Sequence, residues 1–391
     1  MQFANRIQQI TLYLFLFSIN FEMMSLTSGS NISVSKVFGT LYIISILPQY
    51  QVFFRIDAVS HYLIPLALFF GLLTFINLVN INEFDASFFN LTMFLNIILF
   101  WIMINHERKD YLVLEKGMLS FALGATALAV CFIFGIGVIY EEGRLWMFGD
   151  DPNYIASRII IGILILVLAV AQNRLKFGWY RYLLLLPIPI MIKLLYETGS
   201  RLGFIAFVLS LGTGVILYKT KNIWGKLSVL IVGLVTIIIA GLMLLQSETM
   251  VDRLKLTAET GDTAGRTEIW QSLIPVIEKH PVFGVGQTGY TYQSTLILSY
   301  KYSPHNVILE ILCYTGITGL FIYALFLYRI GTAGYISYKE HRLVLPLLLL
   351  IPIAGIILSI QILTVKIGWV IYAYIISTLA VKDGPQHKII I

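Results

Sequence analysis

The sequence predicts an all-α protein whose helices cross a membrane many times. Of its 391 residues, 58% are hydrophobic and only 12% are charged, whereas about 25% are charged in an ordinary soluble domain. The apolar residues fall into blocks of about 17 to 22 residues, the length that a transmembrane helix needs. This composition excludes a soluble enzyme, a disordered chain and a nucleic-acid-binding protein.

Twelve apolar blocks are assigned as membrane spans. Basic residues gather in the connections on one side, so the positive-inside rule places both termini in the cytoplasm. The N-terminal block is kept as an anchor because it has no small-residue cleavage site. The blocks cover about residues 7–24, 37–54, 62–79, 88–104, 117–138, 154–171, 182–195, 202–218, 227–245, 305–327, 344–360 and 364–381.

One connection is long, and it divides the chain into three parts. Spans one to nine occupy residues 1–245, the long outer loop 246–304, and the last three spans with the C-terminal tail 305–391. Long translocated loops are exempt from the positive-inside rule, so the basic residues of this loop do not contradict the topology. The short outer connections hold few basic residues, chiefly Lys36, Arg144, Arg201 and Lys366.

The long loop is expected to contain short helices. After Asp262 or Thr263 as N-cap, apolar residues recur at helical spacing up to His280-Pro281, which predicts a helix on or near the outer membrane surface. A Gly-Val-Gly turn is predicted at 284–286. The apolar face of the helix consists of Ile269, Trp270, Leu273, Ile274, Val276 and Ile277.

Polar motifs stand at the outer helix ends, where they can converge on one site. Arg201, flanked by glycines at a helix start, is suited to bind a phosphate, and Arg266 lies in the first turn of the loop helix. His305 at the start of the tenth span has the pKa range of a general base. Asn306 beside it would orient the imidazole or contact sugar hydroxyls. Lipid contact, solvation and polar anchoring are the alternative interpretations of these residues.

Other polar residues have simpler explanations. Asp151 and Asn153 would cap the sixth span, and Arg158 and Lys193 lie near the outer ends of their spans, where snorkelling accounts for them. The cysteines Cys131 and Cys313 lie inside separate apolar blocks, so no disulfide framework is expected. The acidic residues nearest the outer face are sequence neighbours and do not converge, so we predict no metal site. They are Glu141, Glu142, Asp150 and Asp151.

Three motifs in order resemble the O-antigen ligase and polymerase family. They are Gly-Arg-Thr-Glu-Ile-Trp at 265–270, Pro-Val-Phe-Gly-Val-Gly at 281–286 and Pro-His-Asn-Val-Ile-Leu-Glu at 304–310. Thr-Gly-Ser-Arg-Leu-Gly at 198–203 and Asp-Asp-Pro-Asn at 150–153 also resemble the family pattern. The resemblance therefore covers about residues 145–330, and the remaining spans match only as hydrophobic segments.

The resemblance implies a GT-C-type membrane glycosyltransferase without metal or other cofactor. Such an enzyme transfers a glycan from undecaprenyl diphosphate to an acceptor hydroxyl, with inversion, on the periplasmic face of the bacterial inner membrane. The expected partners are this lipid-linked donor, a glycan or lipid A-core acceptor and membrane lipids, with a chain-length regulator as a further candidate. No nucleic acid is expected.

The resemblance also implies roles for individual residues. Arg201 and Arg266 would bind the donor diphosphate, and His305 would act as the base or orienting group for the acceptor. Ligases of the family often have another arginine after the Gly-x-Gly turn, which this chain lacks, and Lys301 is the nearest substitute. Asn153, Tyr290 and Asn306 complete the expected substrate contacts.

The sequence does not decide between two acceptors, a growing glycan and lipid A-core, and one other class of function remains possible. A polymerase extends a glycan with its own repeat units, and a ligase attaches the glycan to lipid A-core. The compact outer loop and the missing third arginine slightly favour the polymerase. The remoter alternative is a flippase of lipid-linked oligosaccharides, which should have charged residues at mid-membrane depth.

Overall fold

The computed structural model describes most of the chain as α-helix. It describes residues 2–26, 32–57, 59–80, 85–141, 143–218, 266–298 and 303–381, together with single positions between 227 and 259. The principal helices are α1 (Gln2–Ser18), α2 (Val34–Ile46), α3 (Tyr50–Phe53), α4 (Ser60–Val79), α5 (Ser87–Glu107), α6 (Tyr111–Ile133), α7 (Pro152–Gln172), α8 (Ile188–Glu197), α9 (Arg201–Leu217), α12 (Arg266–Lys279), α13 (Gly286–Leu298), α14 (Val307–His341), α15 (Leu345–Ser359) and α16 (Lys366–Ser377).

The all-α membrane architecture expected from the sequence is confirmed in outline. Among the described residues, six helical segments are long and apolar enough to cross a bilayer: α4, α5, α6, α7, the segment Gly178–Glu197 and α14. Shorter apolar helices occupy Arg201–Leu217, Leu345–Ser359 and Lys366–Ala380. The described positions between 227 and 242, in the ninth expected span, are helical. The total of twelve spans stays a prediction.

Three segments differ from the expected spans. The second is broken after Ile46 by a 3₁₀ turn that contains Pro48, because proline cannot donate the helical hydrogen bond. The tenth extends to His341 and bends at Gly316, and its 35 residues, about 50 Å of helix at 1.5 Å each, exceed the hydrocarbon thickness. A hairpin of β1 (Val138–Glu141) and β2 (Arg144–Met147), not expected from the sequence, joins α6 to α7.

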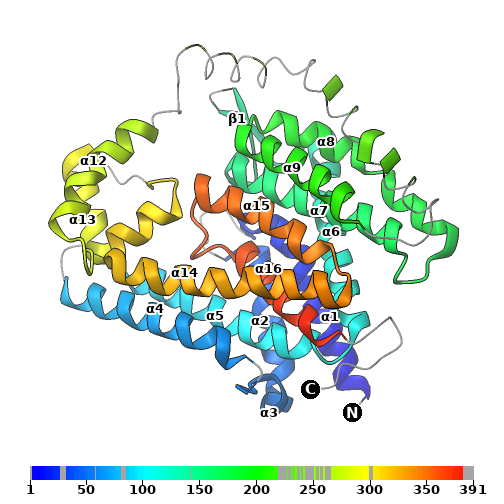
Figure 1. Cartoon of the computed structure of the whole chain (residues 1–391), viewed down its shortest axis with the longest axis horizontal. Coiled ribbons are helices and arrows are strands. Elements are labelled where there is room, and N and C mark those ends of the chain that lie inside the picture. The colour runs from blue at the N-terminus through cyan, green and yellow to red at the C-terminus, as the bar shows by residue number, and fades with distance from the viewer. Residues whose placement is uncertain are drawn as a thin grey trace.

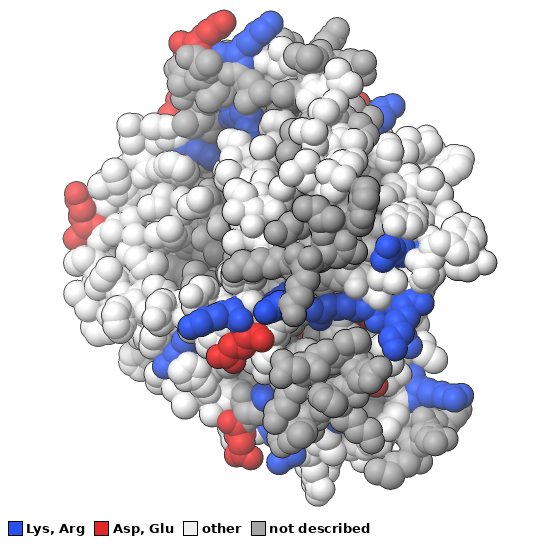
Figure 2. All heavy atoms as spheres, turned by 45° about the vertical axis from the view of Figure 1, so that its right-hand side comes forward, with Lys and Arg blue, Asp and Glu red and all other residues white. Residues whose placement is uncertain are grey.

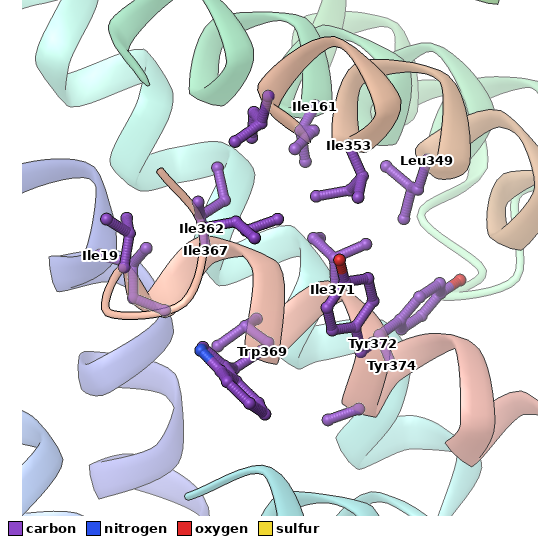
Figure 3. Close-up of a cluster of buried hydrophobic side chains, with 14 of the residues drawn as sticks. Ile19, Ile161, Leu349, Ile353, Ile362, Ile367, Trp369, Ile371, Tyr372 and Tyr374 are labelled. Carbon is purple, nitrogen blue, oxygen red and sulfur yellow. The ribbon is translucent and has the colours of Figure 1, made fainter. Parts of the chain in front are cut away.

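Helix α7 lies at the centre of the bundle. Within its most apolar window, 83% of the residues are buried inside the protein, compared with 28–44% for the other spanning segments. Its neighbours are α6, α8, α9 and α15, whereas α4 and α14 run side by side on another flank (Figure 1). Figure 3 shows Ile161 of α7, Ile353 of α15 and Ile371 of α16 in one buried cluster.

One end of the bundle carries a band of basic side chains (Figure 2). Arg174, just after α7, lies 3.7 Å from Glu115 and donates to Tyr111 Oη (3.0 Å), so the C-terminal end of α7 adjoins the start of α6. The C-terminal end of α14 points to the right-hand side of Figure 1, which faces forward in Figure 2. Lys and Arg side chains form a band across this side. The N-termini of α7, α9 and α14 lie at the opposite end, which we call the polar-motif end.

Candidate functional site

The start of α7 is fixed by its own sequence. Asp151 is the N-cap, and its Oδ1 accepts a hydrogen bond from the backbone N–H of Asn153 at 2.7 Å. Pro152 occupies the first turn, where the lost N–H has no helical partner. The capping interpretation of Asp151 is therefore confirmed. For Asn153 it is wrong, because Asn153 is the second residue of α7 and its side-chain oxygen bonds to other segments.

Asn153 joins the starts of α7 and α9 to the hairpin. Its Oδ1 accepts hydrogen bonds from Ser200 Oγ (2.8 Å) and from Arg144 Nη2 (3.3 Å). Ser200 is the N-cap of α9, and its Oγ also accepts from the backbone N–H of Gly203 (3.2 Å). Arg144 Nε donates to the carbonyl of Thr198 (3.2 Å). These bonds connect three segments that are separate in sequence.

His305 occupies a strained position just before α14. Its φ is +47°, a left-handed conformation that costs a residue with a Cβ on the order of 1–2 kcal/mol. Trp270 Nε1 of α12 donates to the carbonyl of the preceding residue, Pro304, at 2.8 Å. His305 Nδ1 is buried without a hydrogen-bond partner in the part of the chain that the structure describes. Such strain and an unsatisfied ring nitrogen are typical of functional sites.

The electrostatics of His305 show that the motifs converge. Its pKa is lowered from the ordinary value first by burial, then by the positive charges of Arg266 and Arg144, while Asp151 acts in the opposite direction. Arginines favour the neutral imidazole, the form that accepts a proton. The starts of α7, α12 and α14 therefore lie close enough for their charges to interact.

Four helix N-termini contribute to this end of the molecule. Arg201 is the first residue of α9, next to Ser200, and Arg266 is the first of α12. Because the N-terminus of a helix carries a partial positive charge and orphan N–H groups, this arrangement with nearby arginines favours an anion. Arg201 is thus joined to the cluster through Ser200 and Asn153.

The long loop is attached to α14 through its glycine motif. Backbone N–H groups of Val285, Ile317 and Thr318 donate to the carbonyls of Cys313 (2.8 Å), Pro281 (2.9 Å) and Val282 (3.2 Å), respectively. Residues 281–285 therefore fill the bend of α14. This attachment carries α12 and its Arg266 to the start of α14, as the contact between Trp270 and Pro304 shows.

The predicted loop elements are found, with one addition. Helix α12 ends at Lys279, before His280-Pro281, and Gly284 and Gly286 both have positive φ, as the turn requires. Within the apolar face, Ile269, Leu273 and Val276 are buried, but Ile274 is 49% exposed. Helix α13 after the turn was not located from the sequence. The expected N-caps Asp262 and Thr263 lie outside the described residues.

Of the expected substrate contacts, Tyr290 is buried and Asn306 caps a helix, and Lys301 lies outside the described residues. Tyr290 is only 2% exposed, and its ring packs against Tyr314 with centroids 5.4 Å apart. It faces the interior between α13 and α14. Asn306 is the N-cap of α14, and its Oδ1 accepts from the N–H groups of Ile308 and Leu309.

Two arginines have roles that sequence reasoning missed. Arg144 belongs to the cluster, although its only sequence signal was its place in a short outer connection poor in basic residues. Arg158 is 0% exposed and forms ion pairs with Asp150 and with Glu22. The snorkelling interpretation of Arg158 is therefore wrong, because buried acidic partners compensate its charge where the helix is not exposed to lipid.

The described part of the chain contains no group of three or more His, Cys, Asp or Glu side chains arranged to hold a metal ion. The charges that the site does provide are those of fixed arginines and helix N-termini. These groups bind phosphate oxygens directly, with guanidinium groups able to make two parallel hydrogen bonds.

The sequence model of the O-antigen ligase family matches residues 186–324. This part of the chain is similar to the O-antigen ligase family. The matched segment includes α8, α9, α12, α13 and the first half of α14, and with them Arg201, Arg266 and His305. The match confirms the resemblance and supports a membrane glycosyltransferase of the O-antigen ligase or polymerase type. No curated protein and no solved structure matches the chain.

Proposed function

We propose that this protein transfers a glycan from undecaprenyl diphosphate to a sugar hydroxyl, with inversion and without a metal ion. The observation that carries the proposal is the electrostatic cluster of His305, Arg266 and Arg144, which come from the start of α14, the start of α12 and the hairpin before α7. It combines a proton acceptor and Arg266, both within the family-matched residues, with a second fixed cation, Arg144, from outside them. This combination suits a reaction whose leaving group is an anion.

In the proposed reaction, neutral His305 accepts the proton of the acceptor hydroxyl. The acceptor oxygen bonds to the anomeric carbon of the donor from the face opposite the diphosphate. The bond between that carbon and the diphosphate oxygen breaks, and the electron pair leaves with the diphosphate. Arg201 and Arg266, with Arg144 as a third cation, stabilise the developing charge without needing to be protonated first.

The location of the cluster supports an outward-facing GT-C-type site. The opposite end of the bundle bears the basic band (Figure 2), and basic loops are typical of the cytoplasmic side. We therefore place both termini in the cytoplasm and the cluster on the periplasmic face of a bacterial inner membrane. Donor and acceptor would then meet between the bundle, residues 1–245 and 305–391, and the outer loop, residues 246–304.

A polymerase and a ligase would differ only in the acceptor that they use. The sequence slightly favoured a polymerase, in part because a third basic contact was missing. Arg144 supplies a third cation near His305, so that argument loses weight, while the compact loop remains. A flippase stays the remoter alternative, because the polar groups gather at one end of the bundle and a flippase needs them along a central path.

Deletion of the gene tests the proposal in a producing strain. Lipopolysaccharide that carries single repeat units would identify a polymerase, and bare core with accumulated lipid-linked polymer would identify a ligase. The wild-type gene should restore the pattern and an Arg266→Gln gene should not. Donor that accumulates only on the cytoplasmic face would identify a flippase and contradict the proposed transfer.

A further inference from the structure

The basic end of the bundle contains a groove between the ends of two helices. Helix α9 ends at Leu217 and α14 at His341, and α15, which begins beside them, packs against both. The volume of the groove is about 330 Å³, within the usual range of ligand sites. Its lining residues are Leu217, Tyr335, Tyr338, Lys339, Arg342 and Val344.

The charges of this groove favour an anion. Lys339 and Arg342 both line it, no carboxylate does, and the neighbouring Glu340 is not among its lining residues. Neither cation forms an ion pair within the part of the chain that the structure describes. The C-terminal ends of α9 and α14 each contribute only about half a negative elementary charge. The two full positive charges therefore exceed what the helix ends offset.

Arg342 stands at the groove in an uncommon backbone conformation. Its φ is +56°, in the left-handed region that glycine or asparagine usually occupies at a helix end. The backbone N–H groups of Arg342 and Leu343 donate to the carbonyls of Tyr338 and Ser337, both at 3.1 Å, and close the last turn of α14. A long cationic side chain at such a strained position is typical of a functional site.

The surface that leads to the groove is apolar and exposed. Ile216 of α9 is 80% exposed, and Tyr328 and Tyr335 of α14 are 72% and 54% exposed. In a chain that crosses a bilayer, such side chains contact acyl chains, and tyrosine is enriched where the hydrocarbon meets the headgroups. The apolar helices α9 and α15 end and begin at this level. A ligand here can therefore have an anionic head and an apolar tail, and basic pockets between membrane helices bind lipid headgroups.

We propose that this groove binds an anionic phospholipid, with Lys339 and Arg342 contacting its phosphate and the exposed apolar faces of α9 and α14 contacting its acyl chains. The planar guanidinium can make two parallel hydrogen bonds to phosphate oxygens, and the ammonium adds a compact charge. The bound lipid would hold together the ends of two helices whose starts carry Arg201 and follow His305. This site is separate from the proposed transfer and does not depend on it.

The test measures lipid binding to the purified full-length protein in detergent by native mass spectrometry. The probes are phosphatidylglycerol and phosphatidylcholine with the same acyl chains. Wild type should bind phosphatidylglycerol about tenfold more tightly, the effect of one charge-assisted contact. The double variant Lys339→Gln with Arg342→Asn should lose this preference. Equal binding of both lipids to wild type, or an unchanged preference in the double variant, would overturn the inference.

The substitutions are chosen so that α14 keeps its structure. Glutamine is a good helix former, and asparagine tolerates the left-handed region that Arg342 occupies. The double variant should therefore unfold at the same temperature as wild type in detergent without phosphatidylglycerol. Added phosphatidylglycerol should raise the unfolding temperature of wild type more than that of the variant, because a ligand stabilises the folded state to which it binds.

The double variant Lys116→Gln with Lys176→Asn is the matched control. Both lysines are exposed, neither lines the groove, and Lys176 also has a φ of +56°. Lys116 lies near the start of α6 and Lys176 follows α7, so the control removes two positive charges from the same end of the bundle. It should keep the preference, and an equal loss would assign the effect to the basic band as a whole and contradict the proposal.

A water-soluble competitor distinguishes a lipid site from a site for free phosphate. Glycerol 3-phosphate has the anionic group without acyl chains, so at millimolar concentration it should not displace phosphatidylglycerol from wild type. Displacement by glycerol 3-phosphate would show that the apolar faces do not contribute to binding. That result would overturn the assignment of the groove to a phospholipid.

Discussion

His305 combines an unusual backbone conformation with a buried ring nitrogen that has no hydrogen-bond partner among the described residues, and the two properties can be separated by mutation. Asparagine tolerates the left-handed region much better than most residues. His305→Asn should therefore fold normally but lose at least about 100-fold in transfer rate, the usual contribution of a general base. Transfer from lipid-linked donor in proteoliposomes and thermal unfolding would measure the two effects. A normal rate in a normally folded variant would refute the role of His305.

The charges around His305 predict the pH dependence of transfer. Burial and the arginines lower its pKa, so the acid limb of kcat/KM should fall below the ordinary histidine value of about 6.5. Arg144→Gln removes a positive charge, which raises the pKa and moves this limb to higher pH. Asp151→Asn keeps a good N-cap but removes a negative charge, and it should move the limb to lower pH. A limb that neither variant moves would show that His305 is not the titrating group.

At the scale of elements, the bend of α14 holds the loop helices in place. Gly316 has a φ of +61°, and a Cβ there would collide with the backbone of Val282. Gly316→Ala should therefore lower stability by about 1–3 kcal/mol and reduce transfer, because α12 and Arg266 would shift. Gly331 on the same helix has no atom within 4 Å of an added Cβ, so Gly331→Ala should be neutral or slightly stabilising. Denaturation in detergent and donor KM would check both, and equal effects would contradict the proposed attachment.

Sequence patterns suffice to locate those elements whose signals are local. The apolar periodicity and the His280-Pro281 stop located α12, and the glycines located its turn, because these signals are local. The hairpin with Arg144 and the insertion of residues 281–285 into α14 were not located. Both depend on which distant backbone groups are available for hydrogen bonding, and a one-dimensional pattern does not contain that information.

At the scale of the whole molecule, the separation of the polar-motif end from the basic band predicts the topology. Glu141 lies in the hairpin at the polar-motif end, and Lys176 follows α7 at the basic end. With Cys131 and Cys313 replaced by serine, Glu141→Cys should react with a membrane-impermeant maleimide in cells whose outer membrane is permeable. Lys176→Cys should react only after the inner membrane is opened. The reverse pattern would place the proposed site in the cytoplasm.

The sequence by itself determined the helical membrane class, most helix positions, the N-cap Asp151 and the three family motifs. Each of these depends on a local property: hydrophobic length, capping chemistry or residue order. Only the tertiary structure joined Asn153 to Ser200, 47 residues away, and Glu22 to Lys366, 344 residues away. It alone added Arg144 to the site, placed Tyr290 in the interior and paired Arg158. Such contacts depend on how helices pack in three dimensions, and many packings are compatible with the same pattern of apolar blocks.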